Sequence, residues 1–172
     1  LVAASVSAHK ASTSYLQLRL QDTELDGRWD IALRDLDYAL GLDRDNDTRI
    51  TWGEVRQQQA RIVEYVLLRL DVRADADLCT LVVQDLLIAD HSDGSYASLA
   101  LAGRCPHAPL HLGIDYRLFF DLDALHRGLL NLDFRGSHGG IFGPTQHALR
   151  FVSADASRLQ VFVQYLRAGG KA

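Results

Sequence analysis

Residues 43–54, "DRDNDTRITWGE", carry the most definite chemistry in this sequence. A calcium loop of the EF-hand type takes oxygen ligands from its first, third, fifth, seventh, ninth and twelfth residues, the seventh through its backbone carbonyl. The residues at these places are Asp43, Asp45, Asp47, Arg49, Thr51 and Glu54. Hard oxygen ligands favour calcium over transition metals, so the spacing predicts a Ca²⁺ site.

One position departs from the calcium-loop pattern. The sixth residue is normally glycine because the chain turns there with positive φ, and Thr48 stands in its place. A left-handed conformation costs a β-branched residue roughly 1–2 kcal/mol, which weakens binding without abolishing it. The loop occurs once, so we expect a structural site of the extracellular kind, with a dissociation constant on the order of 10⁻⁴–10⁻³ M. The alternative is a capped turn, because Thr51 and Glu54 alone form a capping box.

Most of the remaining sequence alternates between apolar and polar residues, as strands with one buried face do. The expected strands are 14–21, 27–34, 78–89, 95–102, 109–120, 128–134 and 147–152. Apolar residues recur at helical spacing over 52–70 and again over 156–167. The sequence therefore predicts a mainly β protein: a β-sandwich with a helical insert at about 35–70, which carries the calcium loop, and a C-terminal helix.

Composition limits the function classes. The chain has 172 residues with 48% apolar and 23% charged residues, which fits one soluble domain, here assigned to 9–168. A net charge of −4 gives no basic face for nucleic acid. No stretch reaches the roughly 18–20 apolar residues that span a bilayer.

The start of the chain and its two cysteines indicate export. Residues 1–8 end in small residues and resemble the tail of a secretory signal peptide, which would leave His9 as the mature N-terminus. Cys79 and Cys105 lie 13 residues either side of residue 92, the centre of an expected hairpin turn, so they would face each other across the strands. We expect a disulfide that stabilises by about 3 kcal/mol, with a pair of free buried cysteines as the alternative.

Other polar clusters carry weaker predictions. Asp121, Asp123 and His126 follow a strand closely and form a possible second metal or functional site, against the alternative of a polar loop. His138 and His147 bound a glycine-rich loop at 137–147, and His9 would offer its α-amine and imidazole to copper or nickel. Catalytic signatures such as G-x-S-x-G, H-E-x-x-H and a phosphate loop are missing from the sequence, so we do not expect an enzyme.

Four segments together resemble a known family. They are "AHKASTSYLQL", "WDIALRDLDYALGLDRDNDTRITWGEV", "YRLFFDLDALHRGLL" and "FVQYL". From about His9 onward they are similar to the extracytoplasmic N-terminal region of HupE/UreJ-like membrane proteins, usually described as nickel or cobalt permeases or as accessory proteins of hydrogenase and urease. The resemblance implies a periplasmic domain tethered to the inner membrane, with 169–172 as the linker to a membrane region that is its partner.

The expected function is therefore a non-enzymatic, calcium-binding periplasmic domain with a sensory, docking or substrate-capturing role beside a metal transporter. It would contact its own membrane region, a periplasmic protein or a transition-metal ion. Two alternatives stay open. One is a histidine-based copper or nickel carrier that uses residues such as His9, His126, His138 and His147. The other is a hydrolase built on Asp121, Asp123 and His126.

Overall fold

The structure, a computed structural model, describes residues 12–152. The signal-like segment 1–8, His9, the helix expected at 156–167 and the linker 169–172 lie outside these residues. The elements run in the order β1 (Thr13–Gln21), β2 (Glu24–Ala32), α1 (Leu33–Leu40), α2 (Trp52–Gln57), α3 (Gln59–Leu67), β3 (Leu70–Ala74), β4 (Asp77–Leu78), β5 (Thr80–His91), β6 (Gly94–Arg104), β7 (His111–Tyr116), β8 (Arg127–Asp133), β9 (Ser137–Phe142) and β10 (Ala148–Val152).

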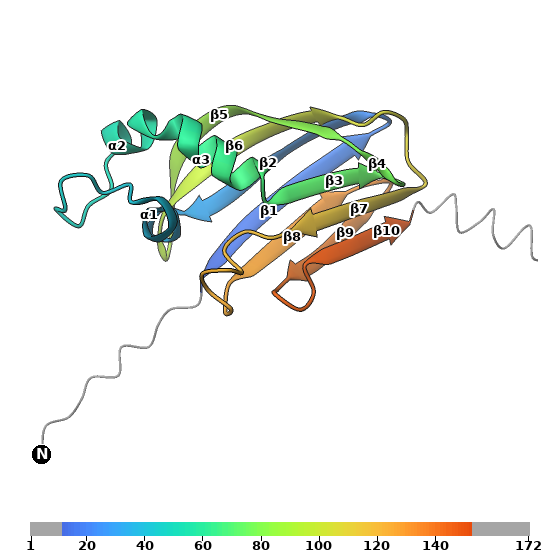
Figure 1. The fold of residues 1–172 in the computed structure, drawn as a ribbon. Helices are drawn as coiled ribbons and strands as arrows, with labels where there is room; N and C mark the ends of the chain where they lie inside the picture. The colour runs from blue at the N-terminus through green and yellow to red at the C-terminus, as the bar shows by residue number, and fades with distance from the viewer. Residues whose placement is uncertain (1–11, 153–172) are drawn as a thin grey trace, which may run out of the picture.

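The strands form two sheets, and the prediction of a mainly β, sandwich-like fold is confirmed (Figure 1). The larger sheet has the order β5-β6-β2-β1-β8-β9 and the smaller one β10-β7-β3-β4. Alternate side chains of each sheet point inward, for example Leu16 and Leu18 of β1 and Leu112 and Ile114 of β7, and they join one apolar core. None of the helices in the described part of the chain is long and apolar enough to cross a membrane.

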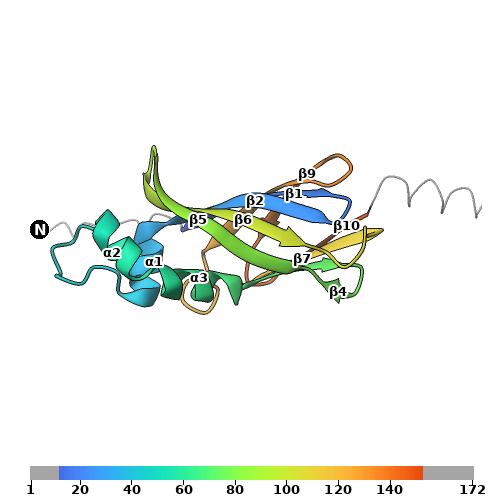
Figure 2. The same cartoon turned by 90° about the horizontal axis from the view of Figure 1, so that it is seen from above.

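The three helices lie on the same side of the larger sheet as the smaller sheet does (Figure 2). Helix α1 packs on β2 and β6, and α3 packs on β5. Their apolar stripes are fully buried at Leu36, Ile62 and Val66. The insert therefore completes the second layer of the sandwich where the smaller sheet stops.

The long helix predicted at 52–70 is divided at Gln58, which ends α2 and precedes α3. Its buried side chain donates from Nε2 to the carbonyl of Gly41, at 3.0 Å, and of Leu42, at 3.4 Å, just after α1. These carbonyls follow the end of a helix and have no partner within it, so Gln58 supplies one. The helical pattern also ends early, because Leu70 already begins β3.

Other predicted boundaries also differ from the structure. The strand expected at 27–34 ends at Ala32, where α1 begins, and the strand expected at 109–120 is shortened to β7, before Phe119 adopts φ +61°. The glycine-rich segment 137–147 was expected to be a loop, but its first part is strand β9. A Cβ on Gly140 would lie 2.4 Å from Leu149, so this glycine lets β9 approach β10 closely.

The predicted disulfide joins Cys79 and Cys105, with an S–S distance of 2.03 Å. At the hairpin turn His91 pairs with Gly94, a register that by itself would set Cys79 against Pro106. A β-bulge between Val83 and Asp85 shifts the register by one residue and thereby brings the two cysteines opposite each other.

Candidate metal centre

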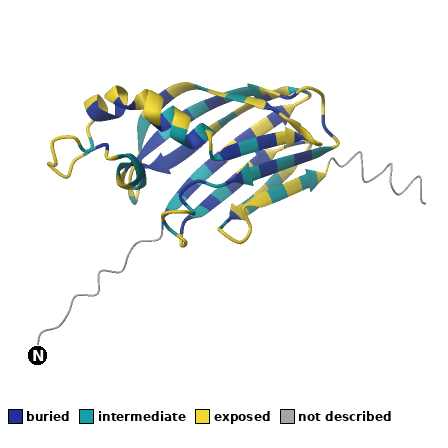
Figure 3. Cartoon of the chain, viewed as in Figure 1, coloured by how far each residue is buried: buried dark blue, intermediate teal, exposed yellow. Residues whose placement is uncertain are grey.

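The predicted calcium loop connects α1 to α2 and protrudes at the helical end of the molecule (Figure 1). Asp43, Asp45 and Asp47 each offer a carboxylate oxygen, and these oxygens lie within 4.8 Å of one another. Among the described residues, no other three or more His, Cys, Asp or Glu side chains converge so closely. Most of the loop is exposed to solvent (Figure 3).

The backbone of the loop already curls around these carboxylates. Thr48 adopts φ +69°, so the sixth residue has the left-handed conformation that the calcium-loop pattern requires despite being threonine. Its N–H donates to Asp43 Oδ2 at 2.9 Å, and the N–H of Arg49 donates to Asp47 Oδ1 at 2.8 Å. A local turn of this kind holds the three side chains on one side of the chain.

Asp43 has one oxygen that these bonds do not satisfy. Its Oδ1 is buried and has no hydrogen-bond partner. Burying an anionic oxygen without a partner is costly, and cation coordination is one way to remove that cost. The residues present therefore fit an ion at the predicted place.

Glu54, the expected twelfth ligand, has a different set of partners. It forms the alternative capping box with Thr51, whose N–H and hydroxyl donate to its Oε2 at 2.9 and 2.8 Å. The N–H of Arg44 donates to Oε1 at 2.8 Å. These bonds, first those from Thr51 and then that from Arg44, lower the pKa of Glu54. Oε2 already accepts two bonds from Thr51, so Glu54 would reach an ion through Oε1, beside the bond from Arg44.

The second predicted cluster is not assembled into one site. Asp121 is largely exposed and pairs with Arg69 at 3.9 Å, and Asp123 accepts from the N–H of Leu125 at 2.8 Å. His126 is fully buried and turns away into the core. Burial lowers the pKa of His126 to about 4, which keeps the imidazole neutral at physiological pH.

His126 belongs to a buried hydrogen-bond chain that the sequence analysis missed. Ser12 Oγ donates to Asp35 Oδ2 at 2.7 Å and lies 2.5 Å from His126 Nδ1. Tyr116 OH lies 2.7 Å from His126 Nε2 and 2.5 Å from Ser14 Oγ. Because the Ser12 proton points to Asp35, Nδ1 must carry the imidazole proton, and Nε2 must accept from Tyr116.

The groups of this hydrogen-bond chain are bonded mainly to one another. Ser12 gives its hydroxyl proton to Asp35 and accepts from His126 Nδ1, and Ser12, Ser14 and Tyr116 are all buried. Gly128 packs beneath Tyr116, where a Cβ would come within 2.7 Å of the ring. The hydrogen-bond chain connects β1, α1, β7 and the start of β8.

The other described histidines of the carrier hypothesis also lie apart. His138 Nε2 is 3.1 Å from the carbonyl of Phe134, and His147 Nδ1 is 2.9 Å from Asp115 Oδ1. The structure does not bring these imidazoles together as one ligand set.

No protein-family model matches the chain, and no curated protein matches it either. The loop geometry and the residues themselves therefore carry the functional argument.

Proposed function

We propose that residues 43–54 bind Ca²⁺ and that the ion fixes the helical insert on the sandwich. The observation that carries this proposal is Asp43 Oδ1, a buried and unpartnered oxygen inside a group of three converging carboxylates. The proposed ligands are the side chains of Asp43, Asp45, Asp47, Thr51 and Glu54 and the carbonyl of Arg49. When bound, the ion supplies positive charge among carboxylates that otherwise repel one another.

The loop is well placed to influence the fold. Leu42 and Val55, on either side of its ligands, are both fully buried in the core. Asp37, near the end of α1, accepts from the N–H of Asp43 at 2.8 Å. An ion that holds Asp43 in place therefore stabilises the junction of α1 with the core.

In the cell, the proposed role is that of a non-enzymatic periplasmic domain that docks, senses or captures substrate for its own membrane region. Two features support this assignment. A disulfide is compatible with an extracytoplasmic location, where weak calcium sites are filled. The resemblance to HupE/UreJ-like proteins links the domain to nickel or cobalt transport.

Thermal unfolding in chelator and in calcium tests the ion site. For a dissociation constant on the order of 10⁻⁴–10⁻³ M, roughly 10 mM calcium should add about 1.4–2.7 kcal/mol, a shift of several degrees. Asp43→Asn should lose this shift. The matched control is Asp26→Asn, which removes an equally charged side chain that is exposed on β2 and paired with Arg19. An equal shift in wild type and Asp43→Asn would contradict the site.

A second experiment tests the cellular role. Full-length protein, with and without residues 9–168, is expressed at matched membrane levels, and nickel accumulation is measured at low external metal. We expect uptake to fall without the domain while membrane insertion persists. Unchanged uptake at limiting nickel would contradict substrate capture.

A further inference from the structure

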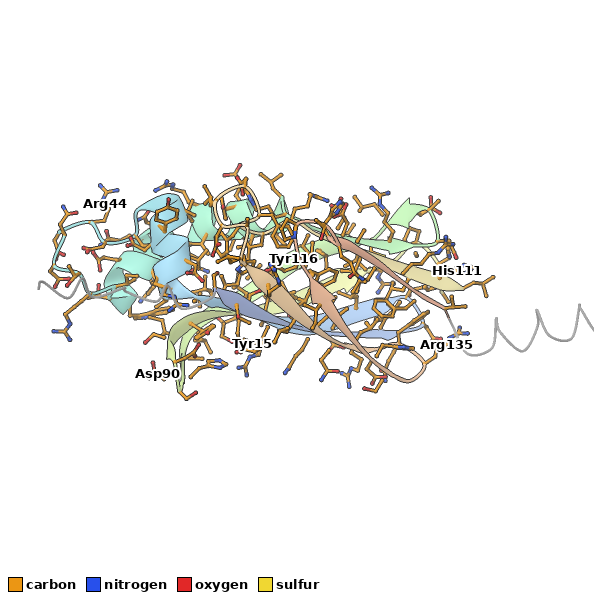
Figure 4. All side chains as sticks on the ribbon, turned by 90° about the horizontal axis from the view of Figure 1, so that it is seen from below. Tyr15, Arg44, Asp90, His111, Tyr116 and Arg135 are labelled. Atoms are coloured by element: carbon orange, nitrogen blue, oxygen red, sulfur yellow. A yellow bond between two sulfur atoms is a disulfide. The ribbon has the colours of Figure 1, made fainter. Side chains whose placement is uncertain are left out.

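Two histidines and two aspartates gather at the end of the sandwich away from the calcium loop. Asp75 lies in the β3–β4 turn, Asp77 begins β4, His107 lies in the connection between β6 and β7, and His111 begins β7. His111 and Arg44 of the calcium loop are at opposite ends of the molecule (Figure 4). None of these four residues belongs to the calcium loop, so the argument is independent of it.

Asp75 is the centre of this group. Its Oδ1 lies 3.1 Å from His111 Nδ1 and accepts the His111 backbone N–H at 2.9 Å. Its Oδ2 lies 3.7 Å from His107 Nδ1, while Asp77 Oδ2 lies 3.2 Å from His107 Nε2. Asp75 adopts φ +54°, an uncommon conformation for a residue other than glycine, and the turn thereby presents its carboxylate to both imidazoles.

We propose that His107, His111 and Asp75, with Asp77 as a further ligand, bind a divalent transition metal of the zinc class. Imidazole nitrogens and carboxylate oxygens are the donors these metals prefer, and three or four of them complete a site. Metal–donor bonds of about 2.0–2.2 Å in a tetrahedron place neighbouring donors about 3.3–3.6 Å apart. The spacings of 3.1, 3.2 and 3.7 Å between these imidazoles and carboxylates are already close to that range.

The donor atoms of this group do not converge as those of Asp43, Asp45 and Asp47 do, so metal binding requires a side chain to move. His107 must turn from Asp77 towards Asp75, so that its nitrogen approaches the one offered by His111. The side chains of His107 and His111 are 44% and 29% exposed, so the turn does not disturb the core. An exposed imidazole changes rotamer on a timescale of nanoseconds or less.

Calorimetric titration of the 172-residue chain with zinc chloride, and separately with nickel chloride, tests the proposal. We expect saturable binding that His107→Ala or His111→Ala weakens by more than the roughly ten- to hundredfold caused by loss of a residue that only supports a ligand. His147→Ala is the matched control, because His147 is an exposed imidazole paired with a single carboxylate, Asp115. Thermal unfolding in chelator checks that each variant is folded.

Three results would overturn the site. They are no saturable heat at millimolar zinc or nickel, unchanged affinity in the double variant of His107 and His111, and loss of binding on His9→Ala alone. The calcium loop serves as an internal reference, since Asp43→Asn should leave zinc affinity unchanged. The calcium proposal and the transition-metal proposal can therefore be contradicted independently of each other.

Discussion

The calcium loop and the buried chain around His126 are both polar clusters, but they are built in opposite ways. The loop gathers its carboxylates from twelve consecutive residues at the surface, where solvent reaches most of them. The buried chain joins Ser12, Tyr116 and His126, which are distant in sequence and buried, to the partly buried Asp35. The loop leaves an oxygen of Asp43 unpartnered, whereas the chain satisfies both nitrogens of its imidazole.

This contrast separates a carboxylate cluster with an unsatisfied oxygen from a network whose imidazole is satisfied by protein groups alone. Unsatisfied buried polar atoms are uncommon in folded proteins and call for an explanation, while a fully bonded network stabilises one packing. Mutation should therefore affect stability strongly at the buried chain and weakly at the loop, unless calcium is present.

The largest effect should come from His126→Ala. The substitution removes a buried ring and takes one of two hydrogen bonds from each of Tyr116 OH and Ser12 Oγ, so we expect a loss of about 3–5 kcal/mol in the free energy of unfolding. Denaturant unfolding measures the loss. In the matched control, His147→Ala, an exposed ion pair with Asp115 is removed, and the loss should stay below about 1 kcal/mol. Similar losses of unfolding free energy in His126→Ala and His147→Ala would contradict a stabilising role of the buried chain.

The next effect is a pH dependence that belongs to the buried chain. Burial lowers the pKa of His126 from the ordinary 6.5 to about 4. Between these pH values the unfolded protein therefore binds a proton at His126 and the folded protein does not. Stability is therefore complete above pH 6.5 and falls as pH drops from 6.5 to 4, by about 3 kcal/mol. Denaturant midpoints at several pH values measure this slope.

His126→Ala provides the control for this slope. The variant has no imidazole to protonate at this position and should lose less stability than wild type over the same range. The exposed His107, whose pKa is raised, acts in the opposite direction and stabilises only below its folded pKa. A wild-type slope no steeper than that of the variant would contradict a neutral, buried His126.

The smallest effect should come from Thr48→Gly in the loop. Thr48 holds φ +69°, so glycine relieves strain, and the gain in stability should be about 0.5–1 kcal/mol after its greater unfolded-state entropy is counted. Calcium affinity should rise with it. Thr80→Gly at the exposed start of β5 is the matched control and should destabilise by about 1 kcal/mol. Destabilisation at both positions would show that the left-handed turn is not strained.

The same contrast explains what the sequence could predict. The carboxylate series from Asp43 to Asp47 and the capping pair Thr51–Glu54 follow local spacing rules, and both occur in the structure. The symmetry of the hairpin predicts the disulfide. The β5–β6 register that brings the two cysteines opposite each other, however, depends on a β-bulge that the local sequence pattern does not predict.

The features that the sequence did not predict depend on contacts between residues that are far apart in the sequence. Asp121, Asp123 and His126 are close in sequence, but His126, just before β8, is buried while Asp121 faces solvent. The partners of His126 come from β1, α1 and β7, and those of His111 come from the β3–β4 turn. The start of α1 at Leu33 was not predicted, because the segment "WDIALR" (29–34) continues the apolar–polar alternation of β2 into the helix.

A crystal structure of the chain grown in roughly 10 mM calcium, with the ion located by its anomalous scattering, tests the central claim most directly. The account predicts one ion in the loop, with oxygen ligands at about 2.3–2.6 Å that include Asp43 Oδ1, Asp45, Asp47 and the carbonyl of Arg49. Glu54 would keep the bonds of its Oε2 to Thr51 and face the ion through Oε1. A loop that holds only water at this calcium concentration, with Asp43 Oδ1 still unpartnered, would contradict the calcium site.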